Sequence, residues 1–360
     1  MTNVTPKITK TLNSAPKKLP PSDKLGFGQY FSDHMFIAQF REGQGWHEAA
    51  VVPYGPISLD PGASVLHYGQ ALFEGMKVFR QQDGRIVFFR PEFNYHRLCE
   101  GAARLCLEAP PLDLFMAGLH EVVKTDERWI PAEPNTALYI RPTLIGTEAF
   151  LGVRPSRETM LMILLSPVGS YYAEGTKPVK IWTEEKYLRA APGGLGAVKA
   201  GANYASSLKA ALEAKKRGYS QVLWLDVEHQ GIEEVGTMNV FFVFDDEIVT
   251  PALNGSILSG GTRDAIIQLM KLKKLPIVDR RITISEVIER LGRGQLKEAF
   301  GTGTAAVISP IGVLAYKGKD WVINNNENGP LSTQLFGEIT SIQRGTQEDR
   351  LGWLTPLLHT

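Results

Sequence analysis

Short apolar runs separated by turn residues characterise the first half of the chain. The runs FIAQF and AAVVP, followed by KVFRQQDGRIVFF, predict strands, and the Asp83-Gly84 step in the last run indicates a hairpin turn. The apolar, β-rich runs ALYIRPTLIG and TMLMILLSPVG are typical of buried strands that neighbour each other in one sheet. Helices are expected near 91–107 and 111–126. This half therefore predicts a sheet accompanied by helices.

The pattern changes after SYYAEGTKPVK, whose small polar residues and turn formers indicate a linker at 173–181. Beyond the linker, NYASSLKAALEAKKRG predicts a helix that ends at Gly218. QVLWLD predicts a strand, EEVGTMNVFFVFDDEIVTP a strand pair joined at Asp245-Asp246, and GTRDAIIQLMKL a further helix. The face of the first helix is predicted to consist of the small and apolar residues Ala205, Leu208, Ala211 and Leu212.

These patterns predict an α/β (α+β) protein with two domains, in agreement with a length of 360 residues. The N-terminal segment 1–19 is rich in Pro, Lys, Ser and Thr, which is typical of a flexible arm. We expect a small N-terminal domain at 20–172 and a larger C-terminal domain at 182–360.

Composition and charge exclude several classes of function. The 39 Lys and Arg residues nearly balance the 38 Asp and Glu residues, so nothing indicates binding to nucleic acid. Cys99 and Cys106 form no Cys-x-x-Cys or Cys/His cluster, so neither a disulfide framework nor a metal site is expected. No window offers the roughly 18 apolar residues of a membrane span, and the N-terminus lacks the apolar core of a signal peptide. We therefore expect a cytoplasmic protein with no membrane partner.

One lysine stands in a segment rich in glycine and alanine, GGLGAVKAGANY, directly before a predicted helix. A catalytic lysine must reach a carbonyl group and lose its proton near neutral pH, which a crowded, partly desolvated site provides. The glycines on both sides of Lys199 permit a close approach of ligand and backbone. The same composition is also typical of a mobile surface loop, so other segments must decide between the two interpretations.

Two turns rich in glycine and threonine are candidates for binding an anion. In SILSGGTRDAI the segment 260–262 precedes a predicted helix, whose N-terminal N–H groups and dipole attract phosphate. In FGTGTAAVISP, Thr302 and Thr304 offer hydroxyl and backbone donors to a phosphate or a carboxylate. A plain helix N-cap and a plain loop remain the alternatives for these two turns.

A carboxylate at a predicted strand adds a third kind of chemistry. Glu234 opens the apolar strand of EEVGTMNVFF, where burial would require a cationic or hydrogen-bonding partner; a solvated strand end is the alternative. A lysine, two anion-binding turns and a buried carboxylate together fit a ligand with a carbonyl, a phosphate and a basic ring nitrogen. Pyridoxal phosphate has all three groups.

The chain resembles the branched-chain amino acid aminotransferases of class IV, which have the fold-type IV architecture, in ordered segments from about Phe27 to Gly329. These segments are HYGQALFEGMKVFR, LYIRPTLIGTE, LLSPVG, GGLGAVKAGANYASSL, EEVGTMNVFF, ILSGGTRDAI and FGTGTAA. The resemblance implies a small N-terminal and a larger C-terminal domain with pyridoxal phosphate bound at their interface. It also implies reversible ping-pong transfer of the amino group between leucine, isoleucine or valine and 2-oxoglutarate.

The resemblance assigns roles around the cofactor. Lys199 matches the lysine that binds the cofactor covalently and moves the proton at the substrate α-carbon, and Glu234 matches the carboxylate that keeps the ring nitrogen protonated. Tyr204 matches the tyrosine that binds the phenolic oxygen, and Arg97 matches the phosphate-binding arginine. The remaining implied cofactor contacts are Leu258 at the ring and Gly260, Gly261, Thr262 and Thr304 at the phosphate.

The resemblance also implies an apolar substrate pocket with a turn that binds a carboxylate. Arg141 matches the residue that receives the second carboxylate of glutamate. A loop around Val153 matches one that contributes to the site of a neighbouring subunit, so a homodimer is implied. The other implied pocket residues are Phe27, Tyr68, Phe73, Tyr139, Tyr171, Thr237, Ala305 and Ala306.

Alternatives with the same fold are a D-amino acid aminotransferase and an aminodeoxychorismate lyase. The HYGQALFEG and YIRPT segments favour the branched-chain group. A non-catalytic phosphate-binding or interaction protein would lack Lys199 or Glu234, and both are present. Some family members carry a Cys-x-x-Cys pair where this chain has Ala306 and Ser309, so no thiol switch is expected there.

Overall fold

The computed structural model describes residues 6–169 and 177–358, and the chain divides into two compact units. Unit 1 comprises Met1–Tyr171, Val198–Gly201 and Ser341–Thr360, and unit 2 comprises Tyr172–Ala197 and Ala202–Thr340. This division differs from the predicted one, which assigned 182–360 to a single domain. The segment that carries Lys199 and the C-terminal tail both belong with the N-terminal unit.

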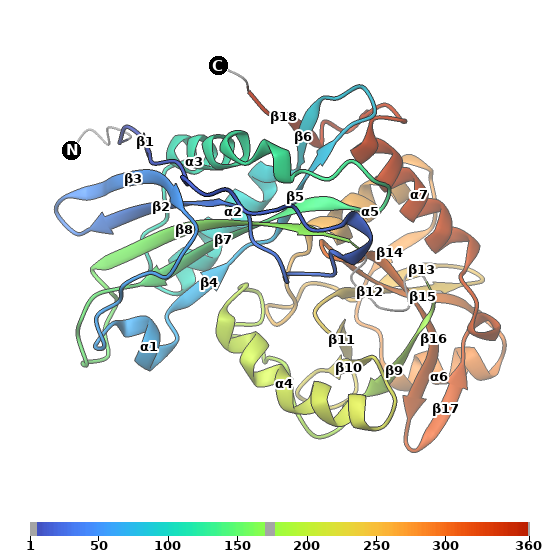
Figure 1. The fold of residues 1–360 in the computed structure, drawn as a ribbon. Helices are drawn as coiled ribbons and strands as arrows, with labels where there is room; N and C mark the ends of the chain where they lie inside the picture. Colours follow the sequence, from blue (N-terminus) through green and yellow to red (C-terminus); the bar gives the residue numbers. More distant parts are fainter. Residues whose placement is uncertain (1–5, 170–176, 359–360) are drawn as a thin grey trace. The chain divides into compact units, whose positions relative to one another are not determined.

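Unit 1 is built on a nine-stranded sheet with the order β1-β3-β2-β8-β7-β5-β6-β18, in which β4 also pairs with β7 (Figure 1). The two predicted central strands are neighbours, since β7 and β8 pair antiparallel from Ala137↔Val168 to Gly146↔Thr159. The predicted hairpin joins β5 and β6 and contains Gly84, with φ at 86°. The strands are β1 (Thr9–Lys10), β2 (His34–Arg41), β3 (Gly45–Pro53), β4 (Ala71–Phe73), β5 (Met76–Arg80), β6 (Ile86–Phe89), β7 (Ala137–Gly146), β8 (Glu158–Val168) and β18 (Leu354–Pro356).

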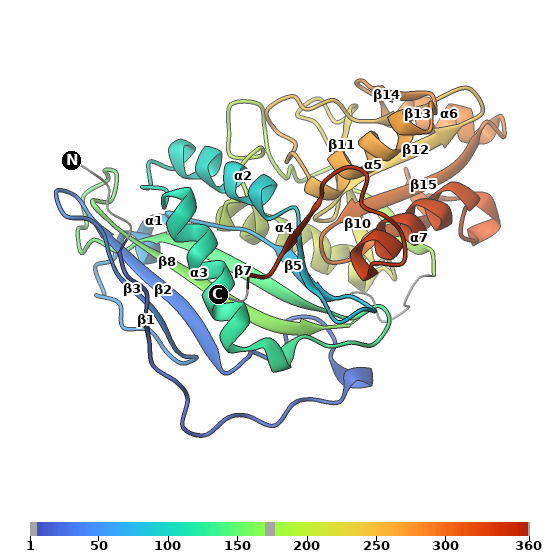
Figure 2. The ribbon, with the colours of Figure 1, turned by 90° about the horizontal axis from the view of Figure 1, so that it is seen from above.

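Two helices cover one face of this sheet, α2 (Pro91–Arg104) and α3 (Leu112–Thr125) (Figure 2). Both were predicted, and their apolar residues pack with those of the strands in one core that includes Leu98, Phe115 and Phe36. Gly118 of α3 allows a close approach, because a Cβ atom there would lie 2.7 Å from two ring carbons of Phe36. The remaining helices of the unit are short: α1 (Ser64–Tyr68), η1 (Ser22–Lys24) and η2 (Glu127–Trp129).

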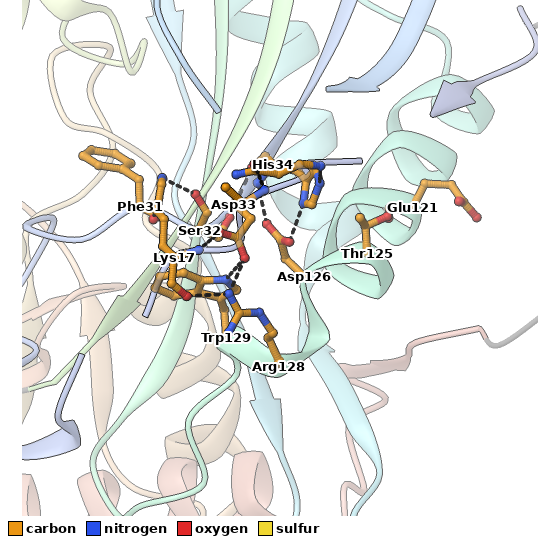
Figure 3. Close-up of polar contacts among 12 residues, drawn as sticks. Lys17, Phe31, Ser32, Asp33, His34, Glu121, Thr125, Asp126, Arg128 and Trp129 are labelled. Carbon is orange, nitrogen blue, oxygen red and sulfur yellow. Dashed lines mark hydrogen bonds and ion pairs between the residues drawn. The ribbon is translucent and has the colours of Figure 1, made fainter. Parts of the chain in front are cut away.

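The described part of the N-terminal segment is held by tertiary contacts and is not the flexible arm that its composition predicts. Strand β1 pairs in parallel with β3, and the N–H of Asn13 donates to Nε2 of His34 at 2.8 Å. The N–H of Lys17 donates to Oδ1 of Asp33 at 2.8 Å, and Nζ of Lys17 donates to the Ser32 carbonyl at 2.7 Å (Figure 3). These bonds could not be predicted from the composition of the segment, because they join it to residues 14 or more positions away.

The contacts of the N-terminal segment centre on two buried carboxylates (Figure 3). Asp33 accepts from Nη2 of Arg128 at 2.6 Å and from Nε1 of Trp129 at 2.8 Å. Asp126 bonds His34 twice, to the backbone N–H at 2.8 Å and to Nδ1 at 2.6 Å. The two side chains that receive the segment, Asp33 and His34, are therefore themselves fixed by neighbours.

Unit 2 contains a second nine-stranded sheet, with the order β11-β10-β9-β16-β15-β12-β13-β14 and with β17 paired to β16. The predicted strand pair at 233–251 consists of three strands, because a turn at Gly236, with φ at 58°, separates β11 from β12. The strands are β9 (Val179–Thr183), β10 (Gln221–Leu225), β11 (Ile232–Val235), β12 (Asn239–Phe244), β13 (Ile248–Thr250), β14 (Ile277–Asp279), β15 (Leu296–Gly303), β16 (Val307–Tyr316) and β17 (Lys319–Val322).

Four longer helices lie in or enter unit 2: α4 (Gly201–Lys216), α5 (Gly261–Leu272), α6 (Ile284–Gly292) and α7 (Pro330–Arg344), with the short η3 (Asn324–Asn326). Helix α4 ends before Gly218 as predicted, but the predicted face is wrong. Its buried side chains include Ala210 and Ala214, which pack with Trp224, whereas Leu208 and Leu212 are 66% and 51% exposed. The small alanines allow the helix to lie close to β10, which hydrophobicity alone did not reveal. None of the helices in the described ranges is long and apolar enough to cross a bilayer.

Candidate active site

The segment that carries Lys199 is fixed to strand β4. The N–H of Phe73 donates to the Lys199 carbonyl at 3.1 Å, and Leu72 forms an isolated antiparallel bridge with Ala200. The Lys199 side chain is partly buried, and its Nζ atom lies 5.0 Å from the centroid of the Phe73 ring. Helix α4 begins at Gly201, so the lysine precedes the helix as predicted. The predicted alternative of a lysine in a loose surface loop does not fit these contacts.

Aromatic rings and an arginine surround this amine. The Arg141 guanidinium carbon lies 4.5 Å from the centroid of Phe73, and its Nη2 donates to the Tyr139 hydroxyl at 3.0 Å. Tyr139 meets Phe27 edge to face, with ring centroids 4.9 Å apart. Residue 75 must be glycine, because a Cβ atom there would overlap the Tyr139 hydroxyl. The structure thus brings together Phe27, Phe73, Tyr139, Arg141 and Lys199, all in unit 1.

Arg97 forms a buried ion pair with Glu74, which lies next to Phe73. Nε and Nη2 of Arg97 donate to Oε1 and Oε2 of Glu74, each at 2.7 Å. Asn94 also donates to Oε2 at 2.7 Å. Glu74 and Arg97 are 0% and 8% exposed. Burial raises the pKa of Glu74, but Arg97, Lys199 and Asn94 outweigh burial and hold the pKa below its ordinary value.

The surroundings of Lys199 lower the pKa of its amine to about 8. The largest cause is burial, which disfavours the charged form, and the guanidinium groups of Arg97 and Arg141 act in the same direction. Glu74 and Tyr139 act in the opposite direction. About one tenth of an amine with this pKa is in its nucleophilic, neutral form at pH 7, far more than for an ordinary lysine.

A second group of predicted residues lies within unit 2 around Glu234. This carboxylate is 3% exposed, and its Oε1 accepts from the Leu258 N–H at 2.8 Å. Nη2 of Arg189 lies 3.2 Å from the same oxygen and also bonds the carbonyls of Gly196 and Ser256. Glu234 is therefore a buried, paired carboxylate rather than a solvated strand end. Nε of Arg189 is buried without a hydrogen-bond partner in the described part of the chain.

The two predicted anion-binding turns also lie in unit 2. Helix α5 begins at Gly261, its N-cap Gly260 has no side-chain cap bond among the described residues, and Thr262 is 7% exposed. Gly260 leaves no room for a side chain because Asn239, which bonds the Leu258 carbonyl, fills that space. The FGTG segment forms the end of β15, and the turn proper is at 304–306. Within the described residues the buried Thr302 hydroxyl has no hydrogen-bond partner.

Other predicted residues are placed apart from these groups or are not described. The Tyr68 hydroxyl bonds the Leu151 carbonyl, and Tyr68 and Val153 are 43% and 85% exposed. In unit 2, Thr237 is exposed in the turn after β11, while Tyr204 on α4 is half-buried. Tyr171 lies outside the described residues, as do residues 173–176 of the predicted linker.

Sequence reasoning missed Glu74, Arg189 and Asn239. Glu74 interrupts the apolar run ALFEGMKVF, and the argument applied to Glu234, a carboxylate in an apolar strand, identifies it equally well. Arg189 and Asn239 carry no comparable signal, because their partners lie 45 and 19 positions away in the sequence. Only the folded chain brings these groups together.

The chain is similar to known proteins over most of its length. Residues 71–313 match the family described as Amino-transferase class IV. The chain is 48% identical over 356 residues to branched-chain-amino-acid aminotransferase 2 of Bacillus subtilis, covering 99% of this chain and 98% of that protein. It is also 48% identical over 341 residues to a probable branched-chain-amino-acid aminotransferase of Staphylococcus aureus, covering 94% of each.

Solved structures show the same architecture. The branched-chain amino acid aminotransferase of Escherichia coli superimposes with a TM-score of 0.77 at 27% identity, covering 91% of this chain and 99% of that chain. The branched-chain aminotransferase of the thermophilic archaeon Thermoproteus uzoniensis, solved with norvaline, superimposes with a TM-score of 0.75 at 26% identity, covering 90% of this chain and 100% of that chain.

The chain belongs to the class IV aminotransferases, and it has the fold-type IV architecture that the sequence predicted. Within this family its relatives at 48% identity place it among the branched-chain-amino-acid aminotransferases.

Proposed function

We propose that this protein transfers the amino group reversibly between leucine, isoleucine or valine and 2-oxoglutarate, with pyridoxal phosphate as cofactor. The observation that carries the proposal is the position of Lys199, whose amine has a pKa of about 8 beside Phe73, Tyr139 and Arg141. The names of the full-length relatives agree with this activity.

Each unit, taken by itself, has groups that suit part of the cofactor. Unit 1 supplies a poorly solvated amine, Lys199, and a guanidinium, Arg97. Unit 2 supplies a buried carboxylate, Glu234, the N-terminus of helix α5, and the Thr302 hydroxyl, which has no hydrogen-bond partner in the described chain. When bound, pyridoxal phosphate supplies an electron-accepting ring that stabilises negative charge at the substrate α-carbon.

We assign the cofactor roles residue by residue. Lys199 binds the cofactor and moves the proton at the substrate α-carbon, because its amine both attacks carbonyl groups and exchanges a proton near neutral pH. Glu234 holds the ring nitrogen protonated, and Arg189 keeps that carboxylate in place. Tyr204 binds the phenolic oxygen. The phosphate is held by Arg97, Gly260, Gly261, Thr262 and Thr304, and Leu258 packs on the ring.

The substrate roles follow from the apolar surroundings of Lys199. Phe27, Phe73 and Tyr139 surround an aliphatic side chain. Nε of Arg141 is buried and has no hydrogen-bond partner in the described chain, so it is a ready donor to the second carboxylate of glutamate or 2-oxoglutarate. We assign Tyr68, Tyr171, Thr237, Ala305 and Ala306 to the remainder of the substrate site.

The proposal extends to a homodimer in the cytoplasm. Within unit 1 the helix α1 and the loop between β7 and β8 expose several large apolar side chains, a property typical of surfaces that bind a partner. These residues are Leu66, Tyr68, Phe150, Leu151 and Val153. Sedimentation velocity tests the dimer, and a monomer at micromolar concentration would contradict it. If the protein is still a dimer when Leu151 and Val153 are both replaced by Glu, the assignment of this surface is wrong.

Borohydride treatment tests the central assignment directly. The purified protein is expected to be yellow, and reduction should attach the cofactor to the peptide that contains Lys199. A Lys199→Ala protein should be colourless after dialysis and inactive. Attachment to another lysine would remove the proposed mechanism.

A substrate panel distinguishes this activity from the related ones. We expect turnover of L-leucine, L-isoleucine and L-valine with 2-oxoglutarate, followed in both directions. Aromatic amino acids and methionine belong in the panel, because one methylene in an apolar pocket changes discrimination by about 1–3 kcal/mol. Turnover restricted to D-amino acids, or release of pyruvate from aminodeoxychorismate, would replace the proposed function by one of the two alternatives.

A further inference from the structure

The buried carboxylate of Glu74 is fixed more firmly than a single ion pair requires. Its two oxygens accept from Nε and Nη2 of Arg97, each at 2.7 Å, which is the bidentate geometry of the strongest arginine pairs. Oε2 also accepts from Nδ2 of Asn94 at 2.7 Å and from the N–H of Gly75 at 3.1 Å. Four donors therefore hold the carboxylate in one position, and the carboxylate in turn holds one edge of the Arg97 guanidinium.

The backbone around Glu74 connects this ion pair to Lys199 and Arg141. The N–H of Phe73 donates to the Lys199 carbonyl at 3.1 Å, and the N–H of Glu74 donates to the Pro142 carbonyl at 2.8 Å. The Phe73 ring has Nζ of Lys199 at 5.0 Å and the Arg141 guanidinium carbon at 4.5 Å from its centroid. Two consecutive residues of the chain thus position the reactive amine, the substrate guanidinium and the buried ion pair.

The charges in this region require a balancing anion. Arg97, Arg141 and the protonated Lys199 are three cations in a poorly solvated region, and like charges there disfavour one another strongly. Among the groups that act on the Lys199 amine, Glu74 and Tyr139 favour its charged form and the two arginines oppose it. A buried ion pair adds little net stability over apolar residues of similar volume, which favours a role in positioning charge for this one.

We propose that Glu74 is a positioning residue of the reaction site, which holds the Arg97 guanidinium in one orientation and balances the positive charge of Arg97 and Arg141 beside Lys199. The inference rests on the proposed role of Lys199 as the reactive amine. In this role Glu74 acts through Arg97 and through its negative charge.

Acetylation of Lys199 in the cofactor-free protein tests the proposal. The rate is measured by mass spectrometry across pH 6 to 11, with the exposed Lys215 as internal reference. Removing the negative charge in Glu74→Gln should move the midpoint of Lys199 acetylation to lower pH, by about one unit, because the two guanidinium groups then act unopposed. Removing the positive charge in Arg97→Gln should move the midpoint to higher pH, and the double variant should lie between the two.

Two further variants separate charge from folding. Glu74→Asp keeps the charge and should leave the midpoint within about 0.3 unit of the wild type, where a one-unit change is the resolved effect. Asp126→Asn removes another buried carboxylate of unit 1, the partner of His34, and should lower the melting temperature without moving the midpoint. A Glu74→Gln protein that melts like Asp126→Asn but keeps the wild-type midpoint would show a merely structural role and overturn the proposal. The same holds if both Glu74→Gln and Arg97→Gln shift the midpoint in one direction.

If Glu74→Gln alone does not fold, the comparison of the double variant with Arg97→Gln remains decisive, because removing the Glu74 charge should still lower the midpoint in that background; equal midpoints would overturn the proposal. The experiment is independent of transamination, because it uses protein without cofactor. A wild-type protein that fails the amino acid panel but shows these opposite shifts contradicts the proposed function and leaves the role of Glu74 intact. A protein that passes the panel without these shifts contradicts only the role of Glu74.

Discussion

Replacement of Arg141 by Gln should affect the two substrates of this enzyme very differently. The Arg141 guanidinium already donates from Nη2 to Tyr139, while Nε is buried without a partner in the described chain. A carboxylate bound there gains a charge-assisted hydrogen bond worth about 1.5–3 kcal/mol. That free energy corresponds to a loss of about 10- to 150-fold in kcat/KM for 2-oxoglutarate in Arg141→Gln. An aliphatic substrate makes no such bond, so kcat/KM for leucine should change by less than about threefold.

The two half-reactions are best measured separately, by following the cofactor absorbance in single turnovers with leucine and then with 2-oxoglutarate. Tyr139→Phe provides a graded comparison, because it removes the hydroxyl that holds Nη2 but leaves the ring against Phe27. The loss of kcat/KM for 2-oxoglutarate in Tyr139→Phe should be smaller than the loss in Arg141→Gln. Equal losses for both substrates would mean that Arg141 supports the structure of the pocket, and the reasoning from its unpaired Nε would be refuted.

Three other predictions concern the amine, the core and the N-terminal segment. In the cofactor-free wild type, Lys199 acetylation should reach half its maximal rate near pH 8, because burial and two guanidinium groups lower the pKa of its amine to about 8. A midpoint near pH 10.4, about the pKa of an ordinary lysine, would contradict this prediction. Gly118→Ala should lower the free energy of unfolding in urea titrations by about 1–3 kcal/mol, because the new Cβ atom meets the buried Phe36 ring. The control Gly337→Ala places its Cβ atom in open space on α7, so the free energy of unfolding should stay the same or rise by up to about 1 kcal/mol. Burial raises the pKa of Asp33, but the hydrogen bonds from Lys17, Trp129 and Arg128 outweigh burial and lower it. The ionised Asp33 therefore stabilises the fold fully above pH about 4, and this stabilisation is lost as the pH falls through the lowered pKa. Backbone hydrogen exchange at 9–17 should accelerate over that pH range, and Asp33→Asn should show fast exchange already at pH 7.

Sequence reasoning succeeded where a local pattern decides the structure. The runs that became β7 and β8 are long, apolar and β-rich, and the loop that became the β5–β6 hairpin contains a residue with positive φ. Lys199 and Glu234 could be singled out because a charged side chain is unusual in the small-residue and apolar segments that contain them. In all these cases the deciding information is local in the sequence.

The features that could not be predicted have one physical cause: each depends on contacts with residues that are distant in the sequence. The face of α4 depends on Trp224 and β10, so the exposed leucines could not be recognised from the helix alone. Strand β1 has two residues and exists because β3 lies beside it. The unit boundaries were missed for the same reason, since Val198–Gly201 joins unit 1 through bonds to β4.

The edge strand β18 completes the first sheet only late in synthesis of the chain. It pairs with β6 at one edge of the first sheet, yet it is synthesised after the whole of unit 2. Chains generally fold from the N-terminus while the ribosome still elongates them, but here the first sheet stays open at that edge until residues 354–356 emerge. The exposed edge is a site for non-native pairing during synthesis. Loss of the C-terminal residues, by early termination or proteolysis, therefore leaves the unit that carries Lys199 unfinished although the lysine itself is present.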